Sequence, residues 1–456
     1  MKITVKIFFV LFAVLSIIAC NKDKDGGEDD PFDAKFSKLT VEENMENVEN
    51  AGIDLVSELG DLEDANAFKV LFHMMDLMEE SGSMMASKPV LEPARLLASF
   101  YQRDLKTGDV YSALKSTAED PETLSDLWDQ VKATYTWNFI TEQFDSTGSD
   151  DDLIIEFPGK ASDATNTATL TIGNLKFFEV TDPREDWPEE LAEMPKGIEM
   201  ELEYKGETLM SAEFSGSYKA DGMPTEVGAT LTIEDFKFSF IAKHTPSTEA
   251  SVTFSLKRGS KLLSEIYLSA EGDWSEESIE DNTITYYDTF YVETWDPVEG
   301  WIETDEIDYI DEYSEPEIEE IIQKANVHLI FMNIKIAGTV DFKKVGDALR
   351  ELDEDESLTQ EEAVDEIVDM LNENVKLVVV YCDDNKKIAE AEAYTYDDGG
   401  DYYPMIRFVY ADGTKVDATT YVQEELSNFI DELNDLISEI NADYDVEIEP
   451  IDTEDM

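Results

Sequence analysis

The spacing of apolar residues predicts helices in the first part of the chain. Between residues 40 and 117, apolar side chains recur at intervals of three and four positions, which places them on one face of a helix. Examples are Phe68, Leu71, Phe72, Met75 and Met78. Gly60, residues 81–83 and Pro89 interrupt the pattern. We therefore expect a bundle of three or four short helices that packs on something larger.

From Thr134 onward the period of the pattern changes to two, which is typical of half-buried β-strands. The candidate strands are residues 134–139, 153–157, 168–172, 198–204, 208–218, 226–242, 250–257 and 261–271. Gly206 and Gly259 lie in short polar segments between adjacent candidates, which favours tight hairpin turns. The pattern therefore predicts an antiparallel meander of long strands.

Two segments of this β region resemble each other. Residues 168–177 and 229–238 carry the same residue at seven of ten aligned positions. The similarity indicates either a repeated β unit or two strand sequences that resemble each other by composition alone.

Residues 262–323 contain no Lys, Arg or His, and their middle part interleaves acidic with aromatic side chains. We expect residues 273–323 to be a loop-rich acidic and aromatic insertion. After it, Thr359 and Glu362 have the spacing of a capping box, which predicts the start of a helix.

The C-terminal part of the chain predicts strands followed by a final helix. The expected strands are residues 375–382, 389–396 and 405–410. A stripe of apolar residues at helical spacing then follows, and we assign it to core packing. The stripe consists of Leu426, Phe429, Ile430, Leu433, Ile437 and Ile440.

The predicted fold class is α+β. It combines an N-terminal helical bundle, a long-stranded antiparallel sheet, flat or curved, and a C-terminal α/β section that ends in a long amphipathic helix. The expected divisions are a signal peptide (1–19), an acidic tether (20–38), a helical segment (39–130), the β-meander (131–272), the insertion (273–323) and the C-terminal section (324–456). The pattern leaves open whether the strands form one sheet or two.

The charge of the chain excludes one class of partner. There are 106 Asp and Glu against 34 Lys and Arg, which gives a formal net charge of −72, while apolar residues make up 42% as in a folded protein. Nucleic-acid binding requires cationic side chains that displace counterions from phosphates, so a nucleic-acid partner is not expected. The acidic surface favours solubility and cationic partners, and its simplest interpretation is a solvated surface.

The N-terminus has the order of segments found in an export signal. Lys2 and Lys6 precede an apolar stretch at residues 7–18, and Ala19 then stands directly before Cys20. The apolar stretch is short for a membrane span and has the length of a signal-peptide core. The alternative is an uncleaved helical anchor.

Residues 17–20 resemble a bacterial lipobox, and residues 21–30 resemble the acidic export signal of Bacteroidota surface lipoproteins. The resemblance implies cleavage before Cys20, lipid on its thiol, and an outer-membrane location, with Asn21 also arguing against retention in the inner membrane. Exposure on the outer face of the cell is the expected arrangement. Residues 134–138 and 153–158 further resemble large uncharacterised lipoproteins of these bacteria, which implies no activity and no site residues.

Candidate chemistry is sparse. His73, His244 and His328 have no metal-ligand neighbours at strand or helix spacing, so we expect no metal, no cofactor and no catalytic set built on them. The acidic turns at residues 150–152, 383–385 and 397–398 have no calcium-loop spacing and are interpreted as solvated turn residues. Cys382 closes an apolar run and is expected to be a buried strand thiol.

Aromatic residues of the insertion are candidates for stacking on sugar rings. Trp295, Trp301 and Tyr309 lie among carboxylates that can accept hydrogen bonds from sugar hydroxyls. The alternative is that their rings cover the core.

The expected function is a membrane-anchored, non-catalytic surface lipoprotein that binds a glycan, protein or cation or serves structurally. One alternative is a carboxylate-dependent glycan hydrolase, which needs two carboxyl groups roughly 5 to 9.5 Å apart. Another is a lipid carrier, which would have a large apolar concave face capped by the terminal helices.

Overall fold

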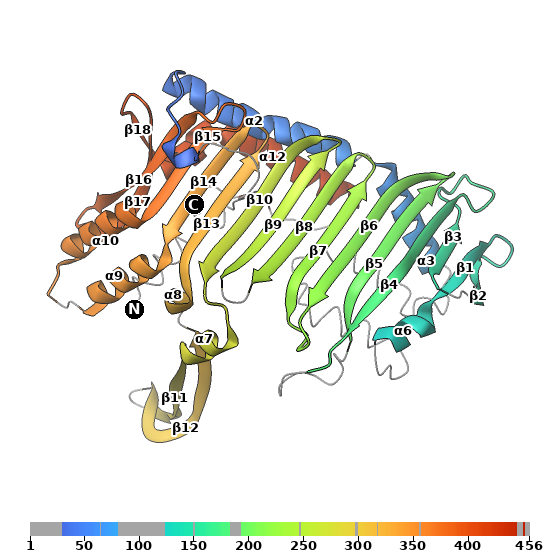
Figure 1. The fold of residues 1–456 in the computed structure, drawn as a ribbon, viewed down its shortest axis with the longest axis horizontal. Helices are drawn as coiled ribbons and strands as arrows, with labels where there is room; N and C mark the ends of the chain where they lie inside the picture. The colour runs from blue at the N-terminus through green and yellow to red at the C-terminus, as the bar shows by residue number, and fades with distance from the viewer. Residues whose placement is uncertain are drawn as a thin grey trace.

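The computed structural model describes residues 30–63, 65–80, 124–148, 151–182, 193–245, 248–296, 300–316, 318–354, 357–444 and 450–451. This part of the chain forms one open sheet of 16 strands, several packed helices and a separate two-stranded hairpin (Figure 1). The α+β class and the antiparallel sheet predicted from the sequence are confirmed.

The strands follow one another across the sheet almost in chain order. Their spatial order is β18-β17-β16-β15-β14-β13-β10-β9-β8-β7-β6-β5-β4-β3-β1-β2. The first nine are β1 (Ala133–Asn138), β2 (Gln143–Gly148), β3 (Leu153–Phe157), β4 (Ala168–Glu179), β5 (Glu193–Tyr204), β6 (Glu207–Tyr218), β7 (Pro224–Ile233), β8 (Phe236–Thr245) and β9 (Glu249–Arg258). The others are β10 (Lys261–Gly272), β13 (Ile322–Phe331), β14 (Ile334–Asp341), β15 (Val375–Tyr381), β16 (Lys387–Asp398), β17 (Asp401–Val409) and β18 (Lys415–Asp417). All neighbours are antiparallel except β1 and β3, which are parallel.

Tight turns explain why the meander forms. Lys205 (φ 54°) and Gly206 (φ 81°) join β5 to β6, and Gly259 (φ 55°) lies in the turn between β9 and β10. Positive φ values are the backbone conformation of the two-residue turns that match the twist of a hairpin. Both turns are those that the sequence predicts.

One predicted strand is in fact two. The pattern predicts a single strand at 226–242, whereas β7 ends at Ile233 and β8 begins at Phe236. Glu234 has a φ of 52°, so the chain turns there. The prediction missed this turn because neither Glu234 nor Asp235 is a glycine, although Asp tolerates turn conformations.

The two segments with similar sequences lie in different parts of the sheet. Residues 168–177 lie within β4, whereas residues 229–238 include the turn at Glu234 between two strands. Both segments nevertheless depart from regular strand geometry just after their shared isoleucine, since Asn174 beside a β-bulge and Glu234 in the turn each have a positive φ. Both interpretations of the similarity stay predictions.

The C-terminal strands belong to the same sheet. β10 pairs directly with β13, although the insertion of 49 residues lies between Gly272 and Ile322. β14 and β15 follow as antiparallel neighbours. The structure thus has one main sheet, and the separate C-terminal α/β section expected from the sequence is its continuation.

Helices flank the sheet. They are α2 (Val41–Glu63), α3 (Asn66–Glu80), α6 (Leu124–Val131), α7 (Glu276–Asp281), α8 (Ile318–Ile321), α9 (Phe342–Glu354), α10 (Gln360–Asn374), α11 (Ala418–Thr420) and α12 (Ser427–Tyr444), with the shorter turns η1 (Pro31–Asp33) and η4 (Tyr421–Glu425). α2 continues through Gly60 and is longer than the short helices expected. The remainder of the predicted bundle, residues 81–117, lies outside the described residues. α10 begins with the predicted capping box of Thr359 and Glu362.

The two faces of the sheet differ in polarity because side chains alternate along each strand. We call the side that carries Phe240, Phe254 and Ile266 the apolar face, and the side that carries Lys237, Ser239 and Thr253 the polar face. Residues directly opposite in adjacent strands share a face, so the register carries this division across the sheet.

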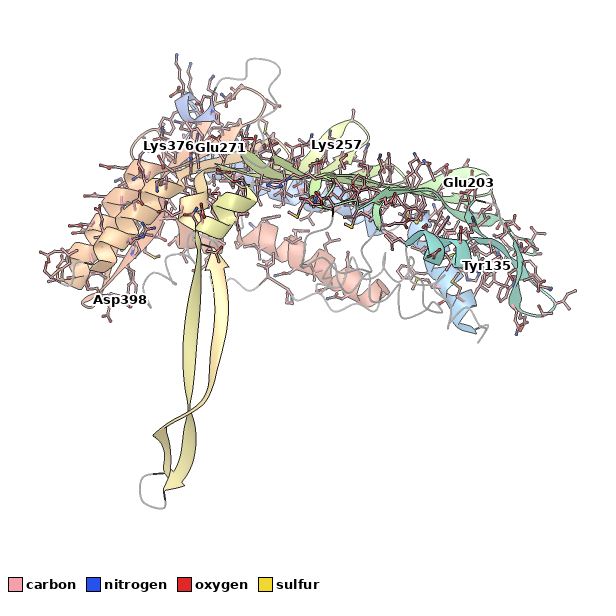
Figure 2. All side chains as sticks on the ribbon, turned by 60° about the horizontal axis from the view of Figure 1, so that its bottom comes forward. Tyr135, Glu203, Lys257, Glu271, Lys376 and Asp398 are labelled. Atoms are coloured by element: carbon pink, nitrogen blue, oxygen red, sulfur yellow. The ribbon has the colours of Figure 1, made fainter. Side chains whose placement is uncertain are left out.

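The apolar face builds most of the core. α3 packs over β1 and β3–β6, where Val70, Met74 and Phe157 are fully buried. α2 packs over β13–β16, where its Met45 and Val48 meet Ile334 and Val379. Figure 2 shows the sheet bending at both ends toward this helix-bearing side, so the apolar face is the concave one.

The acidic and aromatic insertion is a hairpin. It contains α7, then β11 (Thr283–Asp296) paired antiparallel with β12 (Gly300–Pro316), then α8. Figure 2 shows this hairpin standing away from the sheet on the concave side. The expectation of a loop-rich insertion was wrong, because alternating Thr, Tyr and Ile residues favour strands even where acids lie between them.

Candidate functional site: an apolar stripe beside α2

Apolar residues that face each other across neighbouring strands form an unbroken row on the apolar face. The row runs across the sheet from β5 to β15, with each residue directly opposite the next. It consists of Ile198, Phe214, Ala229, Phe240, Phe254, Ile266, Leu329, Ile336 and Val379. A second row lies beside it and consists of Val227, Ala242, Val252, Leu268 and Val327. We call the two rows together the apolar stripe.

The centre of the stripe is uncovered. The exposed fractions are 39% for Phe240, 36% for Val252, 37% for Phe254, 39% for Ile266 and 45% for Leu268. At the same time Val327 and Val379, toward the end of the stripe, are 2% and 7% exposed. Contiguous exposed apolar side chains on a folded protein mark interaction sites, whereas single ones are common.

Helix α2 runs along one side of the stripe. Its Leu55, Leu59 and Leu62 pack against Phe236, Leu256 and Leu263 of β8–β10, which are buried. Figure 1 shows α2 running across the sheet along one edge, where it crosses the strands near their ends. Within the described part of the chain, α2 therefore covers the neighbouring row of the apolar face, and the centre of the stripe beside it is partly exposed. Helix α12, which packs on α2, also lies on this concave side of the sheet (Figures 1 and 2).

Ion pairs fix α2 at this position. The Glu58 carboxylate accepts hydrogen bonds from the Arg258 guanidinium at 3.0 Å and from the Lys261 ammonium at 2.6 Å. These bonds, led by that from Lys261, lower the pKa of Glu58 below its ordinary value. Arg258 also contacts Asp61 and Asp235, so the turns at the ends of β8–β10 are tied to the helix.

The last helix packs on α2. A Cβ built on Gly52 of α2 would lie 2.6 Å from Cδ2 of Phe429 in α12, so the two helices approach closely here. Ile430 and Leu436 of α12 are buried. Of these two, only Ile430 belongs to the predicted stripe, so the assignment of the whole stripe to core packing stays a prediction.

The polar face has no comparable stripe around its exposed isoleucine. Ile241 is 37% exposed, but the residues opposite it are Gly228 and Thr253. It is an isolated apolar side chain and provides a matched comparison for Ile266.

Hydrogen bonds and neighbouring charges favour the ionised form of eight described carboxyl groups. Each described carboxyl group whose pKa departs from its ordinary value has that pKa lowered. These groups are Glu58, Asp163, Asp273, Glu320, Asp341, Glu362, Glu392 and Asp412. A glycosidase acid needs the opposite shift, because it must carry a proton at neutral pH. These carboxylates therefore lend no support to the hydrolase alternative.

The histidines occupy structural positions. His328 is 2% exposed, with its Nε2 atom 3.4 Å from Oε1 of Glu265, and His244 lies edge-on to Trp274. Burial, and secondly the charge of Lys219, lower the pKa of His244. His73 lies in α3. Among the residues that the structure describes, no three or more His, Cys, Asp or Glu side chains gather as a metal site.

The acidic turns follow their expected interpretation where they are described. Asp384 accepts a hydrogen bond from the backbone N–H of Lys386 at 3.2 Å, and Asp397 accepts one from that of Gly400 at 2.8 Å. Side chains that accept from the backbone two or three residues onward stabilise turns.

The backbone of the hairpin brings two of the three candidate stacking residues together. Trp295 is directly opposite Trp301 beside the hairpin end, and Tyr309 is opposite Phe290 further along the ladder. The role of Trp295, Trp301 and Tyr309 in glycan stacking remains a prediction.

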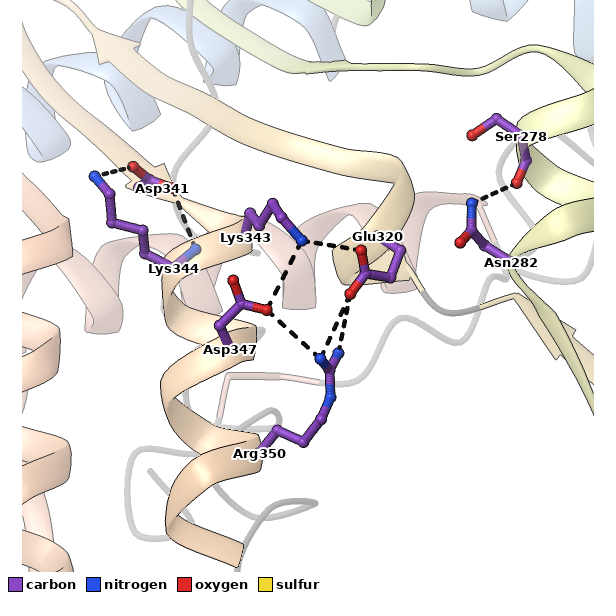
Figure 3. A network of polar contacts seen from close by, with 8 residues as sticks. All are labelled: Ser278, Asn282, Glu320, Asp341, Lys343, Lys344, Asp347 and Arg350. Atoms are coloured by element: carbon purple, nitrogen blue, oxygen red, sulfur yellow. Dashed lines mark hydrogen bonds and ion pairs between the residues drawn. The ribbon is translucent and has the colours of Figure 1, made fainter. Parts of the chain in front are cut away.

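Ion pairs hold the base of the hairpin against α9 (Figure 3). Glu320 of α8 accepts a hydrogen bond from Lys343 at 2.9 Å and also contacts Arg350 at 3.4 Å. The bond from Lys343 is the largest cause of the lowered pKa of Glu320. A Cβ on Gly272 would lie 2.1 Å from the backbone oxygen of Ile321, so the two ends of the insertion meet closely.

Of the two cysteines, Cys382 lies within the described part of the chain. Cys382 is exposed in the turn after β15, so the expected buried thiol was wrong. The strand ends one residue earlier at Tyr381, which pairs with Ile334. Cys20, the expected lipidation site, lies outside the described residues.

The apolar stripe was not predicted from the sequence, although the alternation of apolar and polar residues that contributes to it is visible there. Alternation identifies which residues of each strand share a face, but it does not say which residues lie opposite each other in the next strand. It also does not say which part of the face α2 covers. Ile266 and Phe254 were therefore not singled out.

Comparison with known proteins did not identify a family for this chain. Among the described residues, none of the helices has both the length and the apolar content needed to cross a bilayer. No family model matches the chain, and no curated protein has a significantly similar sequence.

Proposed function

We propose that the protein is a lipid-anchored surface protein of the bacterial outer membrane that binds an acyl chain along the apolar stripe and performs no catalysis. The anchor is lipid on Cys20, as the lipobox-like order of Ala19 and Cys20 implies. The proposal keeps the non-catalytic binding role expected from the sequence and takes its ligand, a lipid, from the lipid-carrier alternative.

The observation that carries the ligand assignment is the exposed centre of the stripe. Phe240, Phe254 and Ile266 lie directly opposite one another on three adjacent strands and are each more than a third exposed. Burying such side chains removes apolar area from water, which contributes about 25 cal/mol for each Å². A ligand that covers them gains this energy without moving the core.

The shape of the stripe favours a long, thin ligand. Neighbouring strands are about 4.8 Å apart, so the six steps from β5 to β13, before the row passes under α2 at Val379, span roughly 29 Å. α2 forms a wall along one side through Leu55 and Leu59. A linear hydrocarbon chain fits an elongated apolar surface of this kind, whereas a sugar would leave its hydroxyl groups without partners there.

The charge of the chain restricts the head group. At a net charge of −72, the protein repels anionic ligands before they reach the stripe. We therefore expect zwitterionic or uncharged lipids to bind better than anionic lipids with the same chain.

The first test measures binding of the neutral dye Nile red and its displacement by lysophosphatidylcholine. The variant Ile266→Ser should weaken binding roughly tenfold, since that factor corresponds to about 1.4 kcal/mol. Ile241→Ser is the matched control, because it removes an equally exposed isoleucine from the polar face. Equal effects of the two substitutions, or no displacement by lysophosphatidylcholine, would refute the assignment.

The anchor has its own test. The native protein should incorporate labelled fatty acid and fractionate with the outer membrane, and Cys20→Ala should abolish both. Retention of the variant in the membrane would contradict lipid anchoring and leave the binding assignment to the stripe unaffected.

A further inference from the structure

The described chain begins on the polar face of the sheet. Phe32 and Ala34 pack against Ala337, Val378 and Val380. Val379, which alternates with the last two, packs on the other face against α2. The first described segment and α2 therefore lie on opposite sides of the same strands.

This segment is firmly attached. Backbone hydrogen bonds join Ser37 to Lys387 at 2.7 Å and Lys387 to Lys35 at 3.0 Å, next to a parallel bridge between Phe36 and Lys387. The Lys387 side chain is 4% exposed, donates to the backbone oxygen of Phe32 at 3.0 Å and pairs with Glu390. The attachment fixes where the tether leaves the sheet.

The length of the tether limits how far this point can stand from the anchor. Ten residue steps separate Cys20 from Asp30, which span at most about 35 Å when fully extended. The polar face beside Asp30 is thus the part of the sheet that the anchor holds nearest to the membrane.

The charge of that face differs from the charge of the whole protein. On β7–β10 and β13–β15, the register places six lysines and five carboxylates on the polar face. The lysines are Lys237, Lys243, Lys257, Lys324, Lys335 and Lys376, and the carboxylates are Glu226, Glu249, Glu265, Glu271 and Asp341. In the whole chain acids exceed bases by 106 to 34. This part of the polar face is nearly neutral and carries lysines that can meet phosphate head groups.

The strands further from the attachment are acidic on the same face. Glu199 lies opposite Glu213, and Glu201 and Glu203 follow on β5. A bilayer with anionic lipids attracts lysines within a Debye length and repels such carboxylates. The neutral region and the tether attachment coincide on the side of the sheet where Figure 2 labels Lys257, Glu271 and Lys376, opposite the hairpin.

From this coincidence we infer that the polar face of β7–β10 and β13–β15 lies against the phospholipid head groups, with the apolar stripe and the hairpin turned away from the membrane. The inference rests on the proposed anchor at Cys20 for the identity of the attachment. β11 has 14 residues, so the hairpin reaches about 45 Å further from the bilayer.

The test compares two fluorophore positions on the lipidated protein in vesicles of phosphatidylcholine and phosphatidylglycerol that carry a head-group quencher. In a Cys382→Ser background, the dye is attached through Thr245→Cys on the polar face or Thr294→Cys near the hairpin end. We expect strong quenching at position 245 and little at 294. Equal or reversed quenching would overturn the orientation.

A second arm tests the charge. Replacing Lys237, Lys257 and Lys376 by Glu should reduce quenching at position 245 on these vesicles and leave it unchanged on phosphatidylcholine alone. Unchanged quenching on the anionic vesicles would show that the lysines do not hold this face to the membrane.

Failure of the anchor is distinguishable from failure of the orientation. If the purified protein carries no lipid and does not join the vesicles, the proposed anchor is wrong. The same dye positions are then measured with a histidine tag in place of residues 1–20, bound to nickel-chelating lipid. Stronger quenching at 245 than at 294 still supports the orientation, and the reverse order overturns it.

Discussion

At the residue scale, two glycines of α2 have opposite surroundings. A Cβ on Gly52 would meet the Phe429 ring at 2.6 Å, whereas a Cβ on Gly60 would have nothing within 4 Å. Alanine is a better helix former than glycine by roughly 0.8–1 kcal/mol. The two positions therefore separate helix propensity from helix packing.

We expect Gly60→Ala to raise the free energy of unfolding by about 0.8 kcal/mol. Gly52→Ala should lower it by about 1–3 kcal/mol, because the added methyl group forces α12 away from α2. Urea unfolding of both variants checks this pair. Stabilisation by both would show that α12 does not pack closely on α2.

The ion pairs of Glu58 predict a pH-dependent contribution to stability. The folded protein lowers the pKa of Glu58 below its ordinary value of 4.5 through hydrogen bonds from Lys261 and Arg258. A lowered folded pKa contributes stability above the ordinary pKa, and the contribution disappears as pH falls through the folded pKa. Its size is about 1 kcal/mol, since these side chains are partly exposed.

Glu58→Gln should therefore destabilise the protein at neutral pH and lose this effect as the pH falls below 4.5. Thermal unfolding across this pH range measures the difference from the native protein. Asp54→Asn, an exposed position one turn earlier on α2, is the matched control and should show no such difference. A constant difference at all pH values would mean that the ion pairs are not its source.

The first residues of the helices show how much of the local structure can be predicted from neighbouring residues in the sequence. The capping box at Thr359 was predicted and is present. Thr40 and Glu43 form the same reciprocal pair before α2, with hydrogen bonds of 2.8 and 3.2 Å, and were not singled out. The motif is local, so both starts were available from the sequence.

At the scale of elements, the hairpin of β11 and β12 lies outside the main sheet, whose strands pair with one another without it. β10 and β13 pair with each other from Ser264 to Gly272, directly below the insertion. Thr283 and Pro316 lie opposite each other at the hairpin base, so a short turn can join the chain there.

Replacing residues 283–316 by an Asn-Gly turn should leave the main sheet folded and change its melting temperature by less than about 1 °C, which for a chain of this length corresponds to less than about 1 kcal/mol. Circular dichroism and calorimetry check this outcome. Binding of Nile red to the stripe should also persist. Loss of the folded state would show that the hairpin stabilises the sheet rather than extending from it.

Strand boundaries were less predictable than strand faces. The alternation in residues 250–257 and 261–271 identified β9 and β10 closely, because apolar and polar residues alternate without interruption. The same signal merged β7 with β8, since the turn at Glu234 preserves the alternation. β13 and β14 were not predicted, and within β14 the small residues Ala337 and Gly338 weaken the alternation.

At the scale of the whole molecule, the net charge of −72 opposes compactness. Salt screens this repulsion, with a Debye length of about 30 Å at 0.01 M and about 8 Å at 0.15 M. The repulsion acts over distances longer than the separation of the two charges in an ion pair. It is therefore a property of the whole charge distribution and not of one site.

The melting temperature should therefore rise as potassium chloride is increased from about 0.01 to about 0.15 M, the range over which the Debye length falls most. Calorimetry at constant pH measures it. Magnesium chloride at equal ionic strength is the control, and an equal rise indicates screening by general counterions. A fall with salt would mean that attractive ion pairs such as Arg258 with Glu58 outweigh the repulsion.

The sequence by itself determined the class of the fold, the faces of its strands and the capped start of α10, because these follow from periodicity and from contacts within a few residues. Only the tertiary structure decided that β10 continues to β13 across the insertion, that the insertion is a hairpin, and that Phe254 and Ile266 stay uncovered. Register and helix placement depend on contacts between residues far apart in the chain, such as the packing of Leu55 against the cluster that contains Leu256, and no local pattern encodes them.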